Sequence, residues 1–281
     1  MSSTDAGGRR PRLVTVGDNC IDVLRYADGR VVCRLGGNAV NVAVQAARAG
    51  AEVDYFGAVG DDADGRLTLS VLRSQGVGIG GAVVRSAPTS VTEIDVRPDG
   101  ERILAREDFG ACRGYAPSPS DLERLLRADH VHIGWLDDGG ALRRALAQQG
   151  RSVSQDLSVN AHPRDLGMEG LTVAFGSLAG PPGPAEALAQ DWLAQGAATA
   201  VVTRGAGGAT IATRDGIWHV PAEPVVPVDT TGAGDSFIAA YLFARLGGAS
   251  PEQAARAGVR AARLTCLHEG GFPQDDAPAR A

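Results

Sequence analysis

The sequence predicts an α/β protein with one domain, a parallel sheet with helices outside it, and a small extra β-sheet. Apolar β-prone segments alternate with segments of helical periodicity along most of the chain, which is typical of parallel sheets. Residues 82–112 interrupt this alternation with a run rich in β-branched residues. The 281 residues are 44% hydrophobic and 21% charged, which is an ordinary composition for a globular protein.

The first predicted strand, 13–16, ends at Gly17 and leads into Asp18, Cys20 and Asp22. If the strand continues, these three side chains share one face, because strand side chains alternate with a period of two. Two carboxylates near the end of a sheet can bind sugar hydroxyls, or they can be solvated residues of a strand end. Both interpretations stay open on these residues alone.

A helix is predicted from Asn38 to Gly50, directly after the glycine pair Gly36 and Gly37. The glycines allow the backbone to approach a ligand closely. Asn38 and Asn41 lie three positions apart, so both amides fall near one face of the first turn, where they can bind hydroxyl groups. Capping by Asn38 alone is the simpler interpretation, but it leaves Asn41, a poor helix former, unexplained.

The domain is predicted to span 11–270, with flexible tails at 1–10 and 271–281. A hairpin within 23–35 and the β-rich segment 82–112 are expected to form one small sheet over a site, that is, a lid. The edge of such a sheet can pair with a second chain, so a homodimer through the lid is a candidate assembly.

The remaining alternation predicts strands near 52–59, 130–133, 152–157, 171–174 and 199–203, and helices near 64–75, 120–127, 141–149, 185–195 and 251–268. The segment 180–184 contains three prolines and is predicted to be a loop. The strand predicted at 199–203 runs into a glycine turn that contains Thr203, Arg204, Gly205 and Gly208. Such a turn can approach a nucleotide, or it can be only a tight entry to a hairpin.

Composition and charge argue against several classes of function. The net charge is −6, which argues against a general nucleic-acid binder and leaves small-molecule substrates open. The four cysteines form no Cys-x-x-Cys pair, so neither a zinc site nor a disulfide framework is indicated. No apolar run approaches the roughly 20 residues of a membrane span, and 1–10 lacks the apolar core of a signal peptide, so we expect a cytoplasmic protein.

The segment 228–237 joins a strand-like run to an apolar helix through Gly232, Ala233 and Gly234. Small residues at a loop-to-helix junction let backbone N–H groups converge, and a helix N-terminus favours negative charge, so the junction suits a phosphate. A carboxylate beside a phosphate is electrostatically unfavourable, so Asp235 is expected to have a further role. It can accept a proton from a hydroxyl that attacks the phosphate, or it can be an ordinary first-turn aspartate.

The segments 36–43 and 229–237 together resemble the two signature motifs of the ribokinase-like (PfkB) carbohydrate kinases. The resemblance covers nearly the whole chain between the tails. It implies a Rossmann-like three-layer sandwich with a small β-sheet lid, and ATP-dependent transfer of a phosphoryl group to a sugar hydroxyl. It also implies Mg²⁺ bound with the ATP. Parts of the family depend on a monovalent cation, and the sequence leaves that dependence open.

The resemblance further implies a role for each matching residue. Asp235 corresponds to the catalytic base, and an aspartate with an ordinary pKa of about 3.9 is ionised at pH 7. The N–H groups of Gly232, Ala233 and Gly234 correspond to the anion hole. The residues that match the family's sugar-binding positions are Asp22, Gly36, Gly37, Asn38 and Asn41, and those that match its nucleotide-binding turn are Thr203, Arg204 and Gly205.

The chain departs from the family pattern in the loop where members often carry Asn-x-x-Glu to organise Mg²⁺-bound water. This loop reads Ser-Leu-Ala-Gly at 177–180, without the glutamate. The segment 156–160 only partly resembles the family's Asp-x-Asn-x-Arg. The metal ligands are therefore unassigned, and the resemblance offers only Asp156, acting through a water molecule, as a candidate.

A finer resemblance, in 17–22 and 36–44, is to the fructoselysine 6-kinase subgroup, which also departs from Asn-x-x-Glu. It implies a fructosamine substrate phosphorylated on its 6-hydroxyl, and the carboxylates of Asp18 and Asp22 would suit the ammonium group of that substrate. The alternatives are a kinase for another sugar such as fructose or ribose, a nucleoside kinase, and a catalytically weak relative that binds sugar or nucleotide. A dinucleotide-binding oxidoreductase is discarded, because its GxGxxG fingerprint is missing after the first strand.

Overall fold

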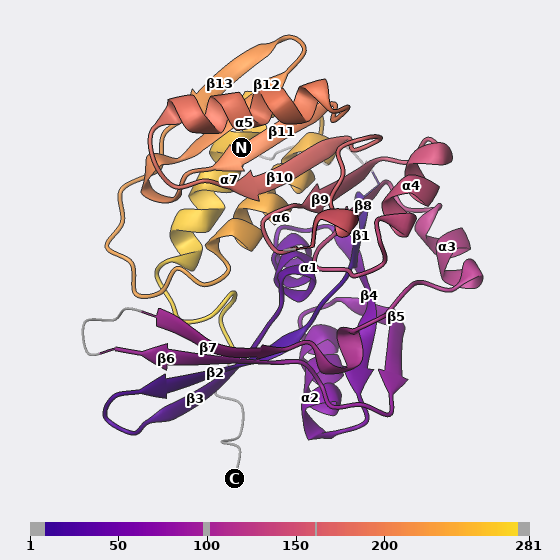
Figure 1. Ribbon diagram of the computed structural model, residues 1–281, viewed down its shortest axis with the longest axis vertical. Helices are drawn as coiled ribbons and strands as arrows, with labels where there is room; N and C mark the ends of the chain where they lie inside the picture. The colour runs from indigo at the N-terminus through magenta and orange to yellow at the C-terminus, as the bar shows by residue number, and fades with distance from the viewer. Residues whose placement is uncertain (1–8, 98–101, 161, 275–281) are drawn as a thin grey trace, which may run out of the picture.

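The computed structural model describes residues 9–97, 102–160 and 162–274, and in these residues a large sheet carries helices on both faces (Figure 1). Its nine strands lie in the order β13-β12-β11-β10-β9-β8-β1-β4-β5. Their bounds are β1 (Arg12–Val16), β4 (Glu52–Gly60), β5 (Gly78–Arg85), β8 (His130–Ile133), β9 (Val153–Asp156), β10 (Val173–Ser177), β11 (Thr199–Thr203), β12 (Ala209–Thr213) and β13 (Gly216–Val220). From β5 to β11 neighbouring strands run parallel, and β12 and β13 add an antiparallel hairpin at one edge.

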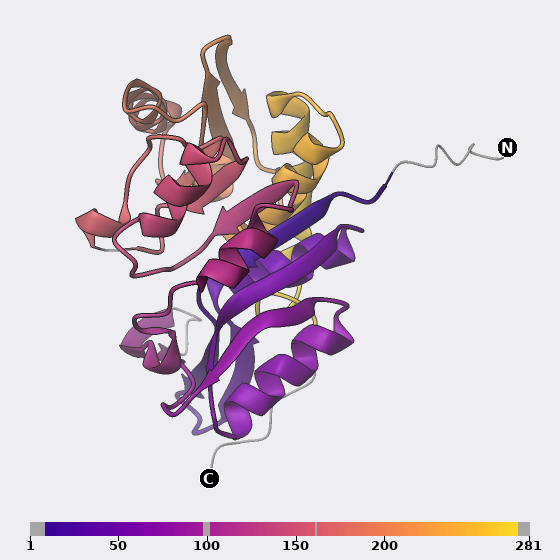
Figure 2. The same cartoon turned by 90° about the vertical axis from the view of Figure 1, so that its right-hand side faces the viewer.

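Helices cover both faces of the large sheet, so the molecule has the predicted three layers (Figure 2). Their bounds are α1 (Asn38–Arg48), α2 (Ala63–Ser74), α3 (Pro119–Leu125), α4 (Ala141–Gln148), α5 (Pro182–Ala194), α6 (Ala233–Leu246) and α7 (Pro251–Thr265). Alternation along β1 separates the two faces, because successive strand side chains point in opposite directions. Leu13 joins the hydrophobic cluster with α1, α2, α6 and α7, whereas Val14 joins the cluster with α3, α4 and α5.

Helix α5 begins earlier than the sequence predicts. It starts at Pro182, so the prediction that 180–184 is entirely a loop is wrong for its last three residues. The first turn of a helix has no intrahelical acceptor for its N–H groups, so the missing N–H of Pro182 and of Pro184 costs nothing there.

The small sheet has four strands in the order β3-β2-β6-β7. Their bounds are β2 (Cys20–Tyr26), β3 (Val31–Gly36), β6 (Val91–Val96) and β7 (Arg102–Asp108). The parallel pair β2–β6 joins two antiparallel hairpins, which gives the predicted lid. The assignment of 82–85 to this sheet is wrong, because these residues belong to β5 of the large sheet, a strand that was not predicted. Assembly of a homodimer through this sheet stays a prediction.

The chain packs against the protein beyond the boundary expected at residue 270. Phe272 is fully buried. The side-chain amide of Gln274 accepts a hydrogen bond from the Leu35 N–H at 2.8 Å and donates to the Leu35 carbonyl at 2.9 Å. The segment 271–274 is therefore part of the packed domain. At the other end of the chain Arg9, which lies in a predicted tail, pairs with Asp129 at 2.6 Å, and the tail residues 1–8 and 275–281 lie outside the described residues. Within the described ranges, no helix has the length and apolar character required to cross a bilayer.

The substitution Phe272→Ala should lower the free energy of unfolding by about 3–5 kcal/mol, because it leaves a cavity where a fully buried ring packs. Denaturant unfolding measures the change. Leu267→Ala is the matched control, since this side chain from the same end of the chain is 48% exposed and should cost less than about 0.5 kcal/mol. Equal effects of the two substitutions would show that 271–274 does not anchor the C-terminal segment.

Candidate active site

Helix α6 begins directly after Gly232, whose backbone is left-handed with a φ of 72°. Glycine adopts this conformation without strain, and a Cβ here would overlap the Gly271 backbone. Among the described residues, the N–H groups of Gly232 and Gly234 have no hydrogen-bond acceptor, whereas Ala233 donates to the Thr230 carbonyl at 3.2 Å. Two of the three predicted anion donors are therefore unused at the positive end of the helix.

The Asp235 carboxylate, in the first turn of α6, is held by two side-chain amides from α1. Asn38 Nδ2 donates to Asp235 Oδ1 at 2.6 Å, and Asn41 Nδ2 donates to Asp235 Oδ2 at 2.7 Å. The sequence predicts that these asparagines bind the substrate, but their nitrogens bind the predicted base. Their Oδ1 atoms are buried without a partner among the described residues. The contact with Asp235 also explains why a poor helix former occupies position 41.

Three carboxylates lie close together at this site. Asn38 Nδ2 also donates to Asp156 Oδ2 at 2.9 Å. Burial raises the pKa of Asp235 to about 8, although the Asn41 hydrogen bond lowers it. The negative charges of Asp156 and Asp18 raise this pKa further. The expectation of an ordinary pKa for Asp235 is therefore wrong, because poor solvation and two like charges disfavour its ionised form.

Asp18 serves as the cap of helix α1. Its carboxylate accepts hydrogen bonds from the N–H groups of Asn38 at 3.0 Å, Ala39 at 3.2 Å and Trp135 at 3.3 Å. The residue in the N-cap position is Gly37, which has no side chain that could do this. Burial raises the pKa of Asp18, and these N–H bonds lower it. The contacts assign Asp18 to the helix N-terminus and not to the substrate ammonium expected from the sequence.

Asp22 lies in the small sheet, not on an extension of the first strand. Strand β1 ends two residues before Asp18, and β2 begins at Cys20 in the other sheet, so the predicted common strand face is wrong for Asp18, whereas Cys20 and Asp22 share a face of β2. Cys20 Sγ donates to Asp22 Oδ1 at 3.1 Å. A Cβ on Gly36 would overlap the Asp22 carboxylate. Glycine at position 36 therefore allows this carboxylate to lie directly against β3.

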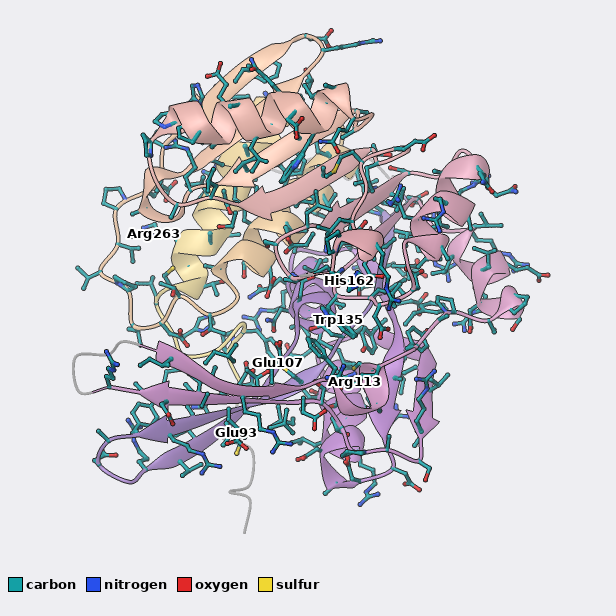
Figure 3. The ribbon with its side chains drawn as sticks, viewed as in Figure 1. Glu93, Glu107, Arg113, Trp135, His162 and Arg263 are labelled. Carbon is teal, nitrogen blue, oxygen red and sulfur yellow. The ribbon has the colours of Figure 1, made fainter. Side chains whose placement is uncertain are left out.

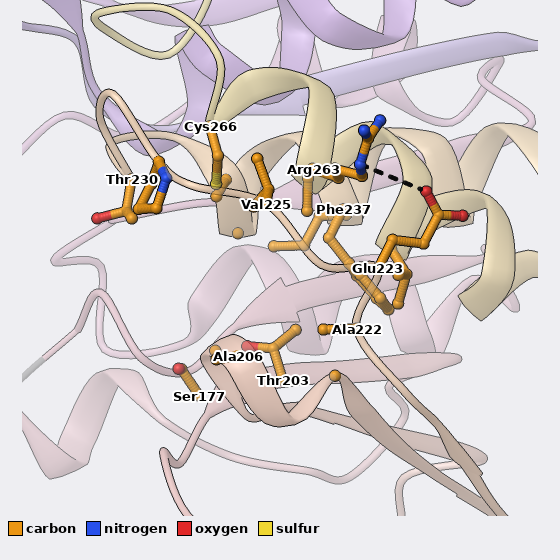
Figure 4. A pocket seen from close by; sticks show the side chains of 18 of the residues that line it. Ser177, Thr203, Ala206, Ala222, Glu223, Val225, Thr230, Phe237, Arg263 and Cys266 are labelled. Atoms are coloured by element: carbon orange, nitrogen blue, oxygen red, sulfur yellow. Dashed lines mark ion pairs between the residues drawn. The ribbon is translucent and has the colours of Figure 1, made fainter.

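A cavity of about 610 Å³ opens beside the N-terminus of α6, and this size suits a nucleotide. Figure 4 shows Thr230 on one side of it and the Arg263–Glu223 ion pair, 3.9 Å long, on the other. The lining between them includes the apolar side chains of Val225 and Phe237. The lining also includes Ala233 and Gly234 of the junction at α6, and Asp156 at the end of β9.

The glycine turn after β11 contributes one wall of this cavity. Thr203, Gly205 and Gly208 line it, and their predicted contact with a nucleotide stays a prediction. Arg204 does not line it. Its buried guanidinium donates from Nη1 to the Gly180 carbonyl at 3.4 Å, so it holds the loop before α5 in place.

The sequence does not single out two elements that shape the site, Asp229 and the segment after α7. The Asp229 carboxylate accepts hydrogen bonds from the N–H groups of Thr231 and Gly270, both at 2.8 Å. It therefore ties the loop before α6 to that segment, and Gly271 then packs against Gly232. Two signals were available: Asp229 opens the second motif, and adjacent glycines permit close backbone approach.

An acidic group at an anion-binding helix N-terminus, beside a nucleotide-sized cavity in an α/β sandwich, is the arrangement of a small-molecule kinase. Comparison with protein families agrees with this class. The model of the pfkB family carbohydrate kinases matches residues 10–139 and 174–277, and the chain belongs to this family. It is a sugar kinase.

Similar proteins include sugar kinases with different substrates. Fructoselysine 6-kinase of Shigella flexneri is 31% identical over 265 residues, which cover 92% of this chain and 99% of that protein. ATP-dependent ribose-1-phosphate kinase of Halopiger xanaduensis is 34% identical over 275 residues, which cover 92% of each chain. The structure of Arabidopsis thaliana ribokinase complexed with ribose and ATP superposes with a TM-score of 0.82 at 22% identity, over 93% of this chain and 94% of that one. This likeness confirms the predicted ribokinase-like fold.

Replacing Asp235 with Asn should lower kcat by about 10²–10⁴-fold, because an amide cannot accept the proton. It should also change the pH dependence of stability. The folded pKa of Asp235 lies above the unfolded value, so its contribution to stability is present at low pH and is lost as the pH rises through about 8. The variant lacks this loss, so its stability relative to wild type should be higher at about pH 9 than at about pH 4.

Steady-state kinetics and urea unfolding at the two pH values measure these effects of Asp235→Asn. Near wild-type turnover would remove Asp235 as the base. An unchanged stability difference between the two pH values would contradict the raised pKa of its carboxyl group.

Replacing Asp156 with Asn should lower the pKa of Asp235, because a neighbouring negative charge disappears. The acidic limb of the kcat/KM profile, where the base becomes ionised, should then move to lower pH. Asp54→Asn is the control, since Asp54 pairs with Arg12 at 2.9 Å near the start of β1 and should leave the limb in place. If the limb stays fixed in the Asp156 variant, it does not report the ionisation of Asp235.

Proposed function

We propose that this chain catalyses the ATP-dependent phosphorylation of the 6-hydroxyl of a fructosamine such as fructoselysine. The observation that carries the proposal is the Asp235 carboxylate, which Asn38 and Asn41 hold at the α6 N-terminus beside the nucleotide-sized cavity. The acceptor class is supported by the similarity to fructoselysine 6-kinase of Shigella flexneri, since the match covers 99% of that protein.

In this reaction Asp235 accepts the proton of the acceptor hydroxyl as the hydroxyl oxygen attacks the phosphoryl group. Asn38 and Asn41 each donate to a different carboxylate oxygen, which fixes the orientation of the carboxylate and leaves acceptor capacity for the proton. The N–H groups of Gly232 and Gly234 stabilise the negative charge of the group in transfer. Positioning and charge stabilisation of this kind supply most of the catalysis in phosphoryl transfer.

The cavity is the proposed site for ATP. Thr203, Gly205 and Gly208 provide close backbone approach on one wall, and the apolar side chains of Val225 and Phe237 suit a flat nucleobase. The cavity reaches the N-terminus of α6, where the terminal phosphate would meet the free N–H groups.

The donor set fits a Mg²⁺ ion that is held mainly by nucleotide phosphates and water. In the part of the chain that the structure describes, no cluster of three His, Cys, Asp or Glu side chains could hold a metal ion. Asp156 lines the cavity with Ser158 and Ser177, and hydrated Mg²⁺ is commonly bound through one or two carboxylates. Asp156 would hold the water of this ion in place of the missing glutamate, and the ion would supply positive charge that neutralises the phosphates.

Asp22 is the proposed ligand for sugar hydroxyls. Its carboxylate is buried and lies against Gly36, next to the glycine pair at the start of α1. A hydroxyl that donates to this carboxylate makes a charge-assisted hydrogen bond in a place with little competing water. Asp18 has no part in the proposed sugar site, because the α1 N-terminus uses its oxygens.

A second candidate acceptor is a sugar 1-phosphate. It is favoured by the 34% identity to the ribose-1-phosphate kinase of Halopiger xanaduensis. An acceptor phosphate needs a cation at the acceptor side, and Arg113 is an exposed arginine close to β7.

A panel of acceptors with ATP and Mg²⁺ tests the proposed function. The kcat/KM for fructoselysine should exceed that for fructose, ribose, ribose 1-phosphate and adenosine by at least about tenfold, which corresponds to about 1.4 kcal/mol of specific binding. The Asp235→Asn variant is the control for background hydrolysis of ATP. Preference for ribose 1-phosphate or adenosine would select an alternative kinase. Binding of ATP and sugar without turnover would identify a binding protein.

A further inference from the structure

One face of the small sheet carries a row of polar side chains that extends away from Asp22. The strand register pairs Asp22 with Thr92, and Thr92 with Glu107. Residues paired directly across neighbouring strands point to the same face, so these three side chains lie along one line. Two strand spacings of about 4.8 Å place Glu107 roughly 10 Å from Asp22. The face proposed to bind the sugar therefore continues to a second carboxylate beyond it.

A pair of stacked aromatic rings lies beside this row. Phe109 follows β7 directly and Trp135 follows β8, and their ring centroids are 3.8 Å apart with planes inclined by 9°. Both side chains are half-buried, so part of each ring stays accessible. The residue before Trp135 is Gly134, where a Cβ would lie 2.6 Å from Asn38 Oδ1. The backbone that leads into Trp135 therefore lies against the amide that holds the catalytic carboxylate.

Two opposite charges flank the rings. The Arg113 guanidinium lies over the Phe109 ring, 5.5 Å from its centroid. Partial burial raises the pKa of Glu107, and the nearby positive charge of Arg113 lowers it. Figure 3 shows Glu107, Arg113 and Trp135 between β7 and the loops of the large sheet, with Glu93 on the opposite side of the small sheet. Within the described ranges, neither Glu107 nor Arg113 forms an ion pair, so both charges are available to a ligand.

We propose that Phe109, Trp135, Arg113 and Glu107 form a subsite for the amino-acid part of the acceptor. The assignment rests on the proposed fructosamine kinase activity. The lysine part of fructoselysine has an aliphatic chain that ends in a carboxylate and an ammonium group. The accessible part of the ring pair binds the chain, the Arg113 guanidinium binds the carboxylate, and Glu107 binds the ammonium.

The charge variants Arg113→Gln and Glu107→Gln test the subsite without removing the rings. Matched controls come from the opposite face of the same strands, Arg106→Gln and Glu93→Gln, whose wild-type residues pair with each other at 4.0 Å. Three acceptors are compared: fructoselysine, the fructosamine made from pentylamine, and ribose 1-phosphate. The pentylamine adduct has the same sugar and a similar chain, but neither terminal charge.

Arg113→Gln and Glu107→Gln should each raise the KM for fructoselysine about tenfold, with kcat within about twofold, since the lost contacts are far from the transferring phosphoryl group. The KM for the pentylamine adduct should change by less than about twofold in all variants, and the two control variants should resemble wild type with both adducts. Equal factors for the two fructosamines, or no change for either, would overturn the subsite while leaving the kinase activity intact.

Wild type separates the two possible failures. If wild type phosphorylates neither fructosamine, the proposed function fails and the subsite fails with it. If wild type prefers ribose 1-phosphate and Arg113→Gln raises the KM for that acceptor, Arg113 binds a phosphate and the amino-acid assignment is wrong.

Discussion

The hydrogen bonds from Asn38 and Asn41 to the Asp235 carboxylate join the two halves of the chain at the point where chemistry is expected. The amides come from the start of α1, and the carboxylate comes from the start of α6. Both helices pack in the same hydrophobic cluster on one face of the large sheet. A slip of either helix by one turn would move the groups about 5 Å apart, so the site requires that both helices begin at fixed residues. Asp18 fixes the first of these starting points through its bonds to the α1 N–H groups.

The starting point of α6 is fixed by residues far away in the sequence. Asp229 binds the N–H groups of Thr231 and Gly270, and Gly271 packs against Gly232. The buried ring that follows these glycines anchors the segment after α7 in the main hydrophobic cluster. The same segment hydrogen-bonds to β3 of the small sheet, so one short stretch of chain positions both the anion-binding junction and the sheet that carries the proposed acceptor site.

Local patterns in the sequence were sufficient to predict the order of the strands and helices apart from β5, the α6 junction, and the common face of Asn38 and Asn41. Each of these depends on periodicity or on residue types within a few positions of one another. The partners of the polar groups depend on long-range contacts and could not be predicted in the same way. Asp18 caps a helix that begins 20 residues later, and Arg204 donates to the carbonyl of Gly180 in a distant loop. The segment 271–274 packs against the domain where a tail was expected. The pKa of a buried group depends on all of these contacts at once.

The raised pKa of Asp235 resolves the conflict of placing an aspartate beside a phosphate site. At neutral pH a carboxyl group with a pKa of about 8 is mostly protonated, so Asp235 itself does not repel an incoming anion. The ionised form of Asp235 would be favoured by cations that accompany a bound nucleotide, because opposite charges stabilise it. The negative charges of Asp18 and Asp156 disfavour the ionised form of Asp235 in the free protein, so the cluster lowers the stability of the free protein at high pH.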